Sequence, residues 1–190
     1  MNEIEILDIF RESNALLEGH FVLSSGLHSA QYLQSALILQ EPKYAQKVCA
    51  ALAEKFKEDK PTVVIGPALG GVIVSYEVGR ALGVRSVFAE RQDGKMTLRR
   101  GFQLGPKDKV LVVEDVITTG GSTKEVIELV EKTGAKVIGV GAIVDRSSGK
   151  ADFSAKFKAL LKIDVQTFSP DNCPLCKSGK PLVKPGSRGI

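Results

Sequence analysis

The residues best suited to chemistry follow a hydrophobic run in the middle of the chain. Glu114 and Asp115 come directly after Val110–Val113, and the turn-like stretch Thr118–Ser122 follows after two further residues. Backbone N–H groups and hydroxyls in such a turn can surround an anion, and a helix starting there adds the positive end of its dipole. The two carboxylates suit a sugar diol or, less directly, a divalent cation. The segment therefore predicts a site for a phosphorylated sugar.

Four predicted strands and two predicted helices must position this segment. Short runs of β-branched residues alternate with longer helical segments, which indicates a parallel sheet with crossover helices. The strands are nearly continuous in apolar residues, as expected for burial on both faces. They are predicted at 62–65, 84–89, 109–113 and 136–144. The helices are predicted over 71–82 and 122–133, closed by Gly83 and Gly134.

Polar residues follow each predicted strand. They are Gly66–Gly71, Glu90-Arg91, Glu114-Asp115 and Asp145-Arg146. In an open parallel sheet, ligands bind in the crevice beyond the carboxyl ends of the strands. We therefore expect these four groups to meet at one site.

Composition limits the class of protein. A chain of 190 residues with 43% hydrophobic and 25% charged residues is predicted to fold as a single domain. No apolar run is long enough for a bilayer, and the acidic start is unlike a secretory signal. Three cysteines form no even disulfide framework, which favours a cytoplasmic protein. The net charge of +4 is mostly interspersed with acids, so neither a nucleic-acid nor a membrane partner is predicted.

The ends of the chain do not continue the strand–helix pattern. Residues 1–40 indicate an amphipathic helix and an extended segment, and residues 150–190 end in a Pro/Gly/Lys-rich tail. We expect both to form a small hood over a core of about 41–149.

Nucleotide-binding alternatives fail, because no Walker A motif occurs and Gly139-Val140-Gly141 lies in a predicted strand without the third glycine.

A hydrophobic strand, two acids and Thr-Thr-Gly before a helix resemble the signature of the type I phosphoribosyltransferases. Five more stretches resemble the orotate phosphoribosyltransferases in particular, so that the likeness covers nearly the whole chain. They are Glu18–Gly26, Gly66–Gly71, the hairpin Glu90–Phe102, Ile143–Arg146 and Cys173–Cys176. The resemblance implies an α/β fold with a central, mostly parallel sheet flanked by helices. It also implies transfer of the phosphoribosyl group of phosphoribosyl pyrophosphate to orotate, with Mg²⁺ bound through the pyrophosphate.

The same resemblance implies roles for individual residues. Gly66–Gly71 would hold the pyrophosphate, Arg146 the orotate, and Lys95, at the tip of a mobile loop, would neutralise the leaving group in the neighbouring subunit of a homodimer. Lys95, Glu114 and Asp115 would be the catalytic residues. The substrate-binding residues would be Ala68, Leu69, Gly70, Gly71, Arg91, Lys95, Glu114, Asp115, Val116, Ile117, Thr118, Thr119, Gly120, Gly121, Ser122 and Arg146.

The sequence departs from the better-known bacterial orotate enzymes at several positions. They carry lysine at Ser24, Tyr-Lys at Leu69-Gly70, lysine at Gln92 and histidine at Thr97. The charges could be replaced by those of Arg91, Lys95, Arg99 and Arg100, since arginine binds phosphate bidentately. Two other functions stay open at this point. One is transfer to a purine base, because the signature reads phosphoribose and not the base. The other is a non-catalytic regulator that senses phosphoribosyl pyrophosphate.

The cysteines and histidines can each be interpreted as functional or as structural residues. Cys173 and Cys176 form a C-x-x-C motif, which could be half of a zinc knuckle or a redox pair. With Cys49 as the third cysteine, the chain can offer a metal at most three thiolates. We expect a structural turn there, unless two subunits share a metal. His20 and His28 show no metal-ligand spacing, and we expect them to be loop or cap residues.

Overall fold

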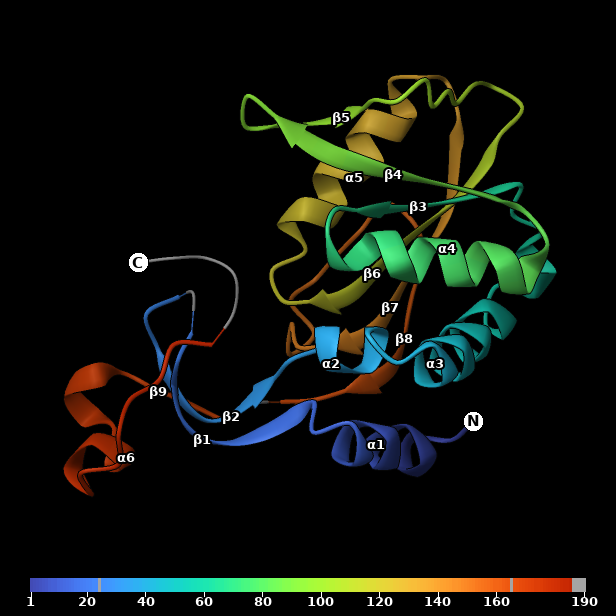
Figure 1. Cartoon of the computed structure of the whole chain (residues 1–190). Coiled ribbons are helices and arrows are strands. Elements are labelled where there is room, and N and C mark those ends of the chain that lie inside the picture. The colour runs from blue at the N-terminus through green and yellow to red at the C-terminus, as the bar shows by residue number, and fades with distance from the viewer. Residues whose placement is uncertain (24, 165, 186–190) are drawn as a thin grey trace.

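The computed structural model describes residues 1–23, 25–164 and 166–185, so Ser24 lies outside the described residues. A six-stranded sheet in the order β5-β4-β3-β6-β7-β8 forms the centre of the molecule (Figure 1). All neighbouring pairs are parallel except β4 with β5. The strands are β3 (Val63–Pro67), β4 (Arg85–Gln92), β5 (Lys95–Leu98), β6 (Lys109–Ile117), β7 (Lys136–Asp145) and β8 (Phe157–Lys162).

Helices cover both faces of this sheet (Figure 1). Alternate strand residues face opposite ways, so that Val64 and Leu111 join the core on one face while Val63 and Val110 join the core on the other. The first face packs against α1 (Glu3–Glu12), α2 (Ala36–Leu39), α3 (Pro42–Glu54) and α4 (Gly70–Leu82), and the second against α5 (Gly121–Glu131). A short 3-10 turn, η1 (Lys57–Asp59), leads into β3. The predicted fold class is confirmed.

The predicted strands are present, but all four run further than expected. β3 ends at Pro67, β4 at Gln92, β6 at Ile117 and β7 at Asp145. Backbone pairing continues through the polar residues, with Glu114 opposite Ala142 and Ile117 opposite Asp145. Backbone hydrogen bonds do not depend on side-chain polarity, and the hydrophobic pattern alone therefore ends each strand too early.

A second, smaller sheet forms the hood, defined here as residues 16–33 and 166–185. Its strands are β1 (Leu16–Val22), β2 (His28–Leu33) and β9 (Thr167–Phe168), in the order β1-β2-β9. The C-terminal segment adds η2 (Pro170–Asn172) and α6 (Pro174–Lys177), and then pairs with β1 through Val183. Figure 1 shows the hood to one side of the central sheet, with blue and red segments side by side.

The expectation that both ends of the chain lie wholly in the hood is wrong for two elements. Strand β8 pairs with β7 and belongs to the central sheet. Helix α1 packs against β8 and buries Ile6, Ile9 and Phe10 in the same core. No helix separates β7 from β8, so the strand–helix alternation that marks the rest of the sheet is missing there. None of the helices in the described residues is long and apolar enough to cross a membrane.

Candidate functional site

A cavity of about 700 Å³ lies where the carboxyl ends of β6 and β7 meet the hood. The cavity lies beyond the carboxyl ends of the strands, as expected for an open parallel sheet. Both the central sheet and the hood contribute to its walls. From the sheet side it is lined by Asp115, Val116, Thr118, Thr119, Arg146, Ser147, Ser148, Lys150 and Asp164. The other side includes Leu27, Tyr32, Ser35 and Thr167.

The turn between β6 and α5 has the geometry of an anion-binding site. Gly120 precedes α5 with φ of 75°, a left-handed conformation that favours glycine, and a Cβ there would lie 2.9 Å from the Phe153 ring. No side chain caps the first turn of α5 in the described structure, and Gly121 N–H makes only a 3.4 Å contact with Thr119 Oγ1. The first amides of this helix are thus available to an anion.

Asp115 lies where three segments meet. Ser35, a buried residue before α2, donates a hydrogen bond to the Asp115 carboxylate. A Cβ added to Gly70, at the start of α4, would lie 2.6 Å from the same carboxylate. The expected pyrophosphate loop thus passes close to the Asp115 carboxylate.

Glu114 differs sharply from Asp115 in its surroundings. It is 9% exposed, and Asp115 N–H donates to Glu114 Oε1 at 3.2 Å. Burial, followed by the negative charge of Asp115, raises the pKa of the Glu114 carboxyl well above its usual range. Glu114 is not among the residues that line the cavity, whereas Asp115 is.

Arg146 and Ser147 place two unmatched buried polar groups in the cavity wall. Arg146 Nε and Ser147 Oγ are both buried without a hydrogen-bond partner among the described residues. Burial lowers the pKa of the Arg146 guanidinium, and Tyr32 opposes this shift. Buried donors without partners cost free energy, about 1–3 kcal/mol each, which a ligand with acceptor oxygens could recover. This wall of the cavity suits a carboxylate or carbonyl group.

Comparisons with known proteins agree with this geometry. The phosphoribosyl transferase domain model matches residues 35–172. The orotate phosphoribosyltransferase of Desulforamulus reducens is 59% identical over all of both chains, and that of Carboxydothermus hydrogenoformans is 56% identical over 97% of this chain and 98% of its own. The chain belongs to the orotate phosphoribosyltransferase family. A crystal structure of the Aeropyrum pernix orotate phosphoribosyltransferase has the same fold, with a TM-score of 0.72 at 23% identity, covering 83% of this chain and 93% of its own.

In this member of the orotate phosphoribosyltransferase family, the loop cations lie apart from the cavity. Arg91 forms a bidentate ion pair with Glu125 on α5, at 2.7 and 2.8 Å, and donates to Gly94 O. Lys95 follows a tight turn in which Asp93 and Gly94 have φ of 50° and 79°. Both cations are exposed on the β4–β5 hairpin, and neither lines the cavity. Their predicted contacts with pyrophosphate remain predictions.

Several other predicted residues lie around the turn before α5 or at the start of α4. Ile117 is 1% exposed in the core beside the turn, and Leu69 is 82% exposed before α4. Gly120, Gly121 and Ser122 form the start of α5. Sequence reasoning missed Ser35 and Tyr32, which lie far along the chain from the signature and carry no local motif. It also missed Ser147, which a closer look at the residue after Asp145-Arg146 could have suggested.

Proposed function

We propose that this chain transfers the phosphoribosyl group of phosphoribosyl pyrophosphate to orotate, giving orotidine 5′-phosphate and pyrophosphate. The observation that carries the proposal is the presence of two sets of polar groups in one cavity. Asp115 and Thr118-Thr119, beside the first turn of α5, suit a phosphorylated sugar. The unmatched Arg146 Nε and Ser147 Oγ, which follow β7, suit the carboxylate and carbonyl groups of orotate. The family relationship supports the same assignment.

The chemistry requires orientation and charge stabilisation more than a nucleophilic side chain. Displacement at the anomeric carbon passes through a cationic state, which nearby acids stabilise. In this proposal Asp115 and Glu114 contact the ribose hydroxyls, and the amides at the start of α5 hold the 5′-phosphate. Gly66–Gly71 holds the pyrophosphate beside Asp115, in keeping with the close approach of Gly70 to that carboxylate.

Mg²⁺ fits the donor set of this cavity. Asp115 and Asp164 both line it, and carboxylate oxygens are ligands that Mg²⁺ accepts alongside water and substrate phosphates. When bound, the ion would neutralise charge on the departing pyrophosphate. We propose Asp115 as the residue that holds it, directly or through water.

We also propose a homodimer in which Lys95 reaches the partner's cavity. Leu69, Ile73 and Tyr76 lie four and then three residues apart, so they share one side of α4 and the turn before it, and they are 82%, 42% and 63% exposed. Grouped exposed apolar residues of this kind suit a subunit interface. The β4–β5 hairpin that carries Lys95 lies at the edge of the central sheet (Figure 1). A cytoplasmic location is likewise a proposal.

Steady-state assays with a panel of bases test the proposed reaction. The enzyme would be given phosphoribosyl pyrophosphate, Mg²⁺ and, in turn, orotate, uracil, adenine, guanine, hypoxanthine and xanthine, with pyrophosphate release and the nucleotide product both measured. We expect kcat/KM for orotate to exceed that for every other base by about a hundredfold or more. Turnover of a purine base without turnover of orotate would contradict the proposal. Ligand binding with no pyrophosphate release would instead indicate a regulator.

A further inference from the structure

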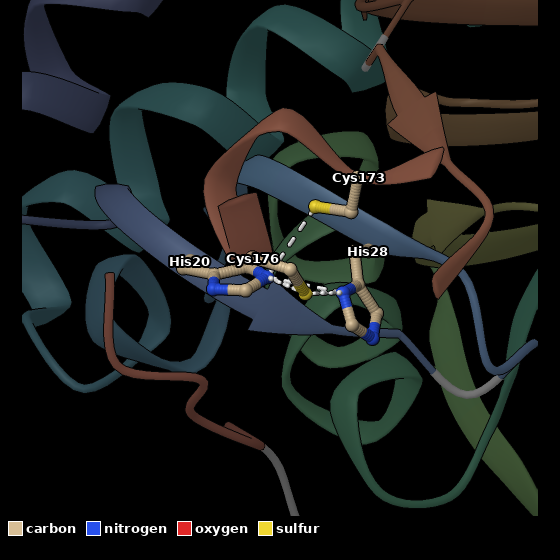
Figure 2. Close-up of side chains that lie close together, drawn as sticks. All are labelled: His20, His28, Cys173 and Cys176. Carbon is tan, nitrogen blue, oxygen red and sulfur yellow. Dashed lines mark hydrogen bonds between the residues drawn. The ribbon is translucent and has the colours of Figure 1, made fainter. Parts of the chain in front are cut away.

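Four metal-binding side chains meet in the hood, away from the residues that line the cavity. His20 lies on β1, His28 begins β2, Cys173 follows η2 and Cys176 lies in α6. One ligand atom from each lies within 4.8 Å of all the others. Figure 2 shows the two histidines on the strands and the two cysteines on the C-terminal segment, with the side chains facing one another. Both histidines lie in the hood, as the expectation of loop or cap residues allows, but on strands and facing the two cysteines.

The separations match those of a tetrahedral metal centre. His20 Nε2 lies 3.0 Å from His28 Nδ1, 3.5 Å from Cys173 Sγ and 3.7 Å from Cys176 Sγ. Cys176 Sγ lies 3.3 Å from His28 Nδ1. With zinc bonds of about 2.0–2.1 Å to nitrogen and about 2.3 Å to sulfur, neighbouring ligands of a tetrahedron lie roughly 3.3–3.8 Å apart. Small movements would bring all four atoms to one ion.

A backbone contact orients one of the histidines for this role. His20 Nδ1 lies 2.8 Å from the carbonyl oxygen of Lys180, which can only accept a hydrogen bond. Nδ1 must therefore carry the proton, so the neutral ring has a lone pair on Nε2, the atom that faces the cysteines. Histidines that bind metals in proteins almost always have such a contact on the other ring nitrogen.

We propose that His20, His28, Cys173 and Cys176 bind one Zn²⁺ in a tetrahedral Cys₂His₂ site within a single chain. Mixed thiolate and imidazole ligands in this geometry favour zinc over the oxygen-preferring cations. Binding would release one proton from each thiol and would leave the ion, two thiolates and two neutral imidazoles without net charge. His20, His28 and Cys173 are buried, so the site is closed to substrate on most sides, as structural zinc sites are.

The hood has little else to hold it together. Apart from Cys173, the buried apolar side chains among its described residues are Phe21 and Leu33, and Leu33 belongs to the core of the central sheet. Units with so small a core usually need a metal or disulfides. The zinc ligands join β1 and β2 to a segment about 150 residues later, so the ion would fasten the two chain ends of the hood to each other.

The proposed zinc would also position one wall of the cavity. His28 follows Leu27, and Ser29 pairs with Thr167 on β9; Leu27 and Thr167 both line the cavity. The role is structural, because none of the four ligands lines the cavity. Loss of zinc should loosen this wall while the central sheet stays folded, and so raise KM for the base more than it lowers kcat.

Metal analysis of tag-free protein tests the site directly. The protein would be incubated with ZnCl₂, separated from free metal by gel filtration and analysed by mass spectrometry for zinc. We expect about one zinc per chain in the wild type and in the control Cys49→Ala, whose cysteine is buried elsewhere. The double variant Cys173→Ser/Cys176→Ser should hold about tenfold less. A wild type that retains no zinc, or a double variant that retains as much, would overturn the proposal.

Two further measurements on the wild type do not depend on a variant folding. Replacement of zinc by Co²⁺ should give the visible absorption bands of tetrahedral cobalt with thiolate ligands, and their absence would contradict the site. Stripping with a chelator should lower Tm, and added ZnCl₂ should restore it. An unchanged Tm would indicate a metal-free, hydrogen-bonded cluster. Either result stands apart from the test of the proposed reaction, which measures products.

Discussion

The two walls of the cavity are built in different ways. On the sheet side, Glu114–Ser122 is one continuous piece of chain, held between a strand buried on both faces and a helix. On the hood side, β1 and β2 meet β9 and the C-terminal segment, and the cluster of His20, His28, Cys173 and Cys176 joins residues about 150 positions apart. The first wall is fixed by the core, whereas the second depends on a few polar contacts.

This difference suggests that the two sides of the cavity contribute to binding different halves of the substrate. In the proposed reaction, the helix amides and Asp115 on the sheet side bind the phosphoribosyl half of the substrate. The hood lies opposite, next to Arg146, where the base would lie. A region held by few buried contacts can change its shape without unfolding the core. The following substitutions test the groups proposed to bind each half of the substrate, and the hairpin outside the cavity.

The largest effect is expected for Asp115→Asn on the sheet side. The substitution keeps the size of the side chain but removes the charge that would face the ribose and the metal. We expect kcat/KM for phosphoribosyl pyrophosphate to fall about a hundredfold, since hydrogen bonds to charged groups are worth about 1.5–3 kcal/mol. Steady-state kinetics measure it, with the exposed Asp8→Asn as a control. A loss below about threefold would remove Asp115 from the catalytic residues.

Lys95→Ala tests the hairpin that lies outside both walls. If Lys95 neutralises pyrophosphate as it departs, kcat should fall about thirtyfold while the dissociation constant of phosphoribosyl pyrophosphate changes less than about threefold. Lys107→Ala, also exposed, is the matched control. Equal losses in turnover and binding would refute a transition-state role. If the lysine acts across a dimer, mixing Lys95→Ala with Asp115→Asn subunits should restore part of the activity.

Arg146→Lys tests the base side. Lysine keeps the positive charge but loses the planar pair of donors, so a bidentate contact with the orotate carboxylate would be lost. We expect KM for orotate to rise about tenfold and KM for phosphoribosyl pyrophosphate to stay within about twofold of the wild type. Initial-rate measurements with each substrate varied in turn would show this. A rise in KM for phosphoribosyl pyrophosphate alone would place Arg146 on the other half of the substrate.

The smallest effect is expected for Glu114→Gln, measured as stability. The pKa of Glu114 is higher in the folded than in the unfolded protein, so its contribution to stability is present below the unfolded pKa and is lost as pH rises through the folded one. Glutamine removes this loss. Thermal unfolding at pH 8 should therefore show Tm raised by about 2–4 °C, and at pH 4 by much less. A lower Tm at pH 8 would mean that the carboxylate is well solvated or paired.

The sequence predicts the sheet side well because its information is local. The run Val110–Val113, the acids and the glycine turn each indicate their structure without reference to distant residues, and α5 follows where expected. The hood could not be predicted in the same way. Neither His20 nor His28 has a spacing typical of metal ligands, and their partners come from the far end of the chain. Ser35 donates to Asp115 across 80 positions of the chain, a contact that no local pattern reveals.

Calorimetric titration of two ligands into two variants tests most directly whether Asp115 and Arg146 bind different halves of the substrate. Phosphoribosyl pyrophosphate with Mg²⁺ and orotidine 5′-phosphate would each be titrated into Asp115→Asn and Arg146→Ala. We expect Asp115→Asn to weaken binding of both ligands about tenfold or more. Arg146→Ala should weaken only orotidine 5′-phosphate, which carries the base, and leave phosphoribosyl pyrophosphate within about twofold of the wild type. Equal weakening of both ligands by both variants would contradict the assignment of Asp115 and Arg146 to different halves of the substrate.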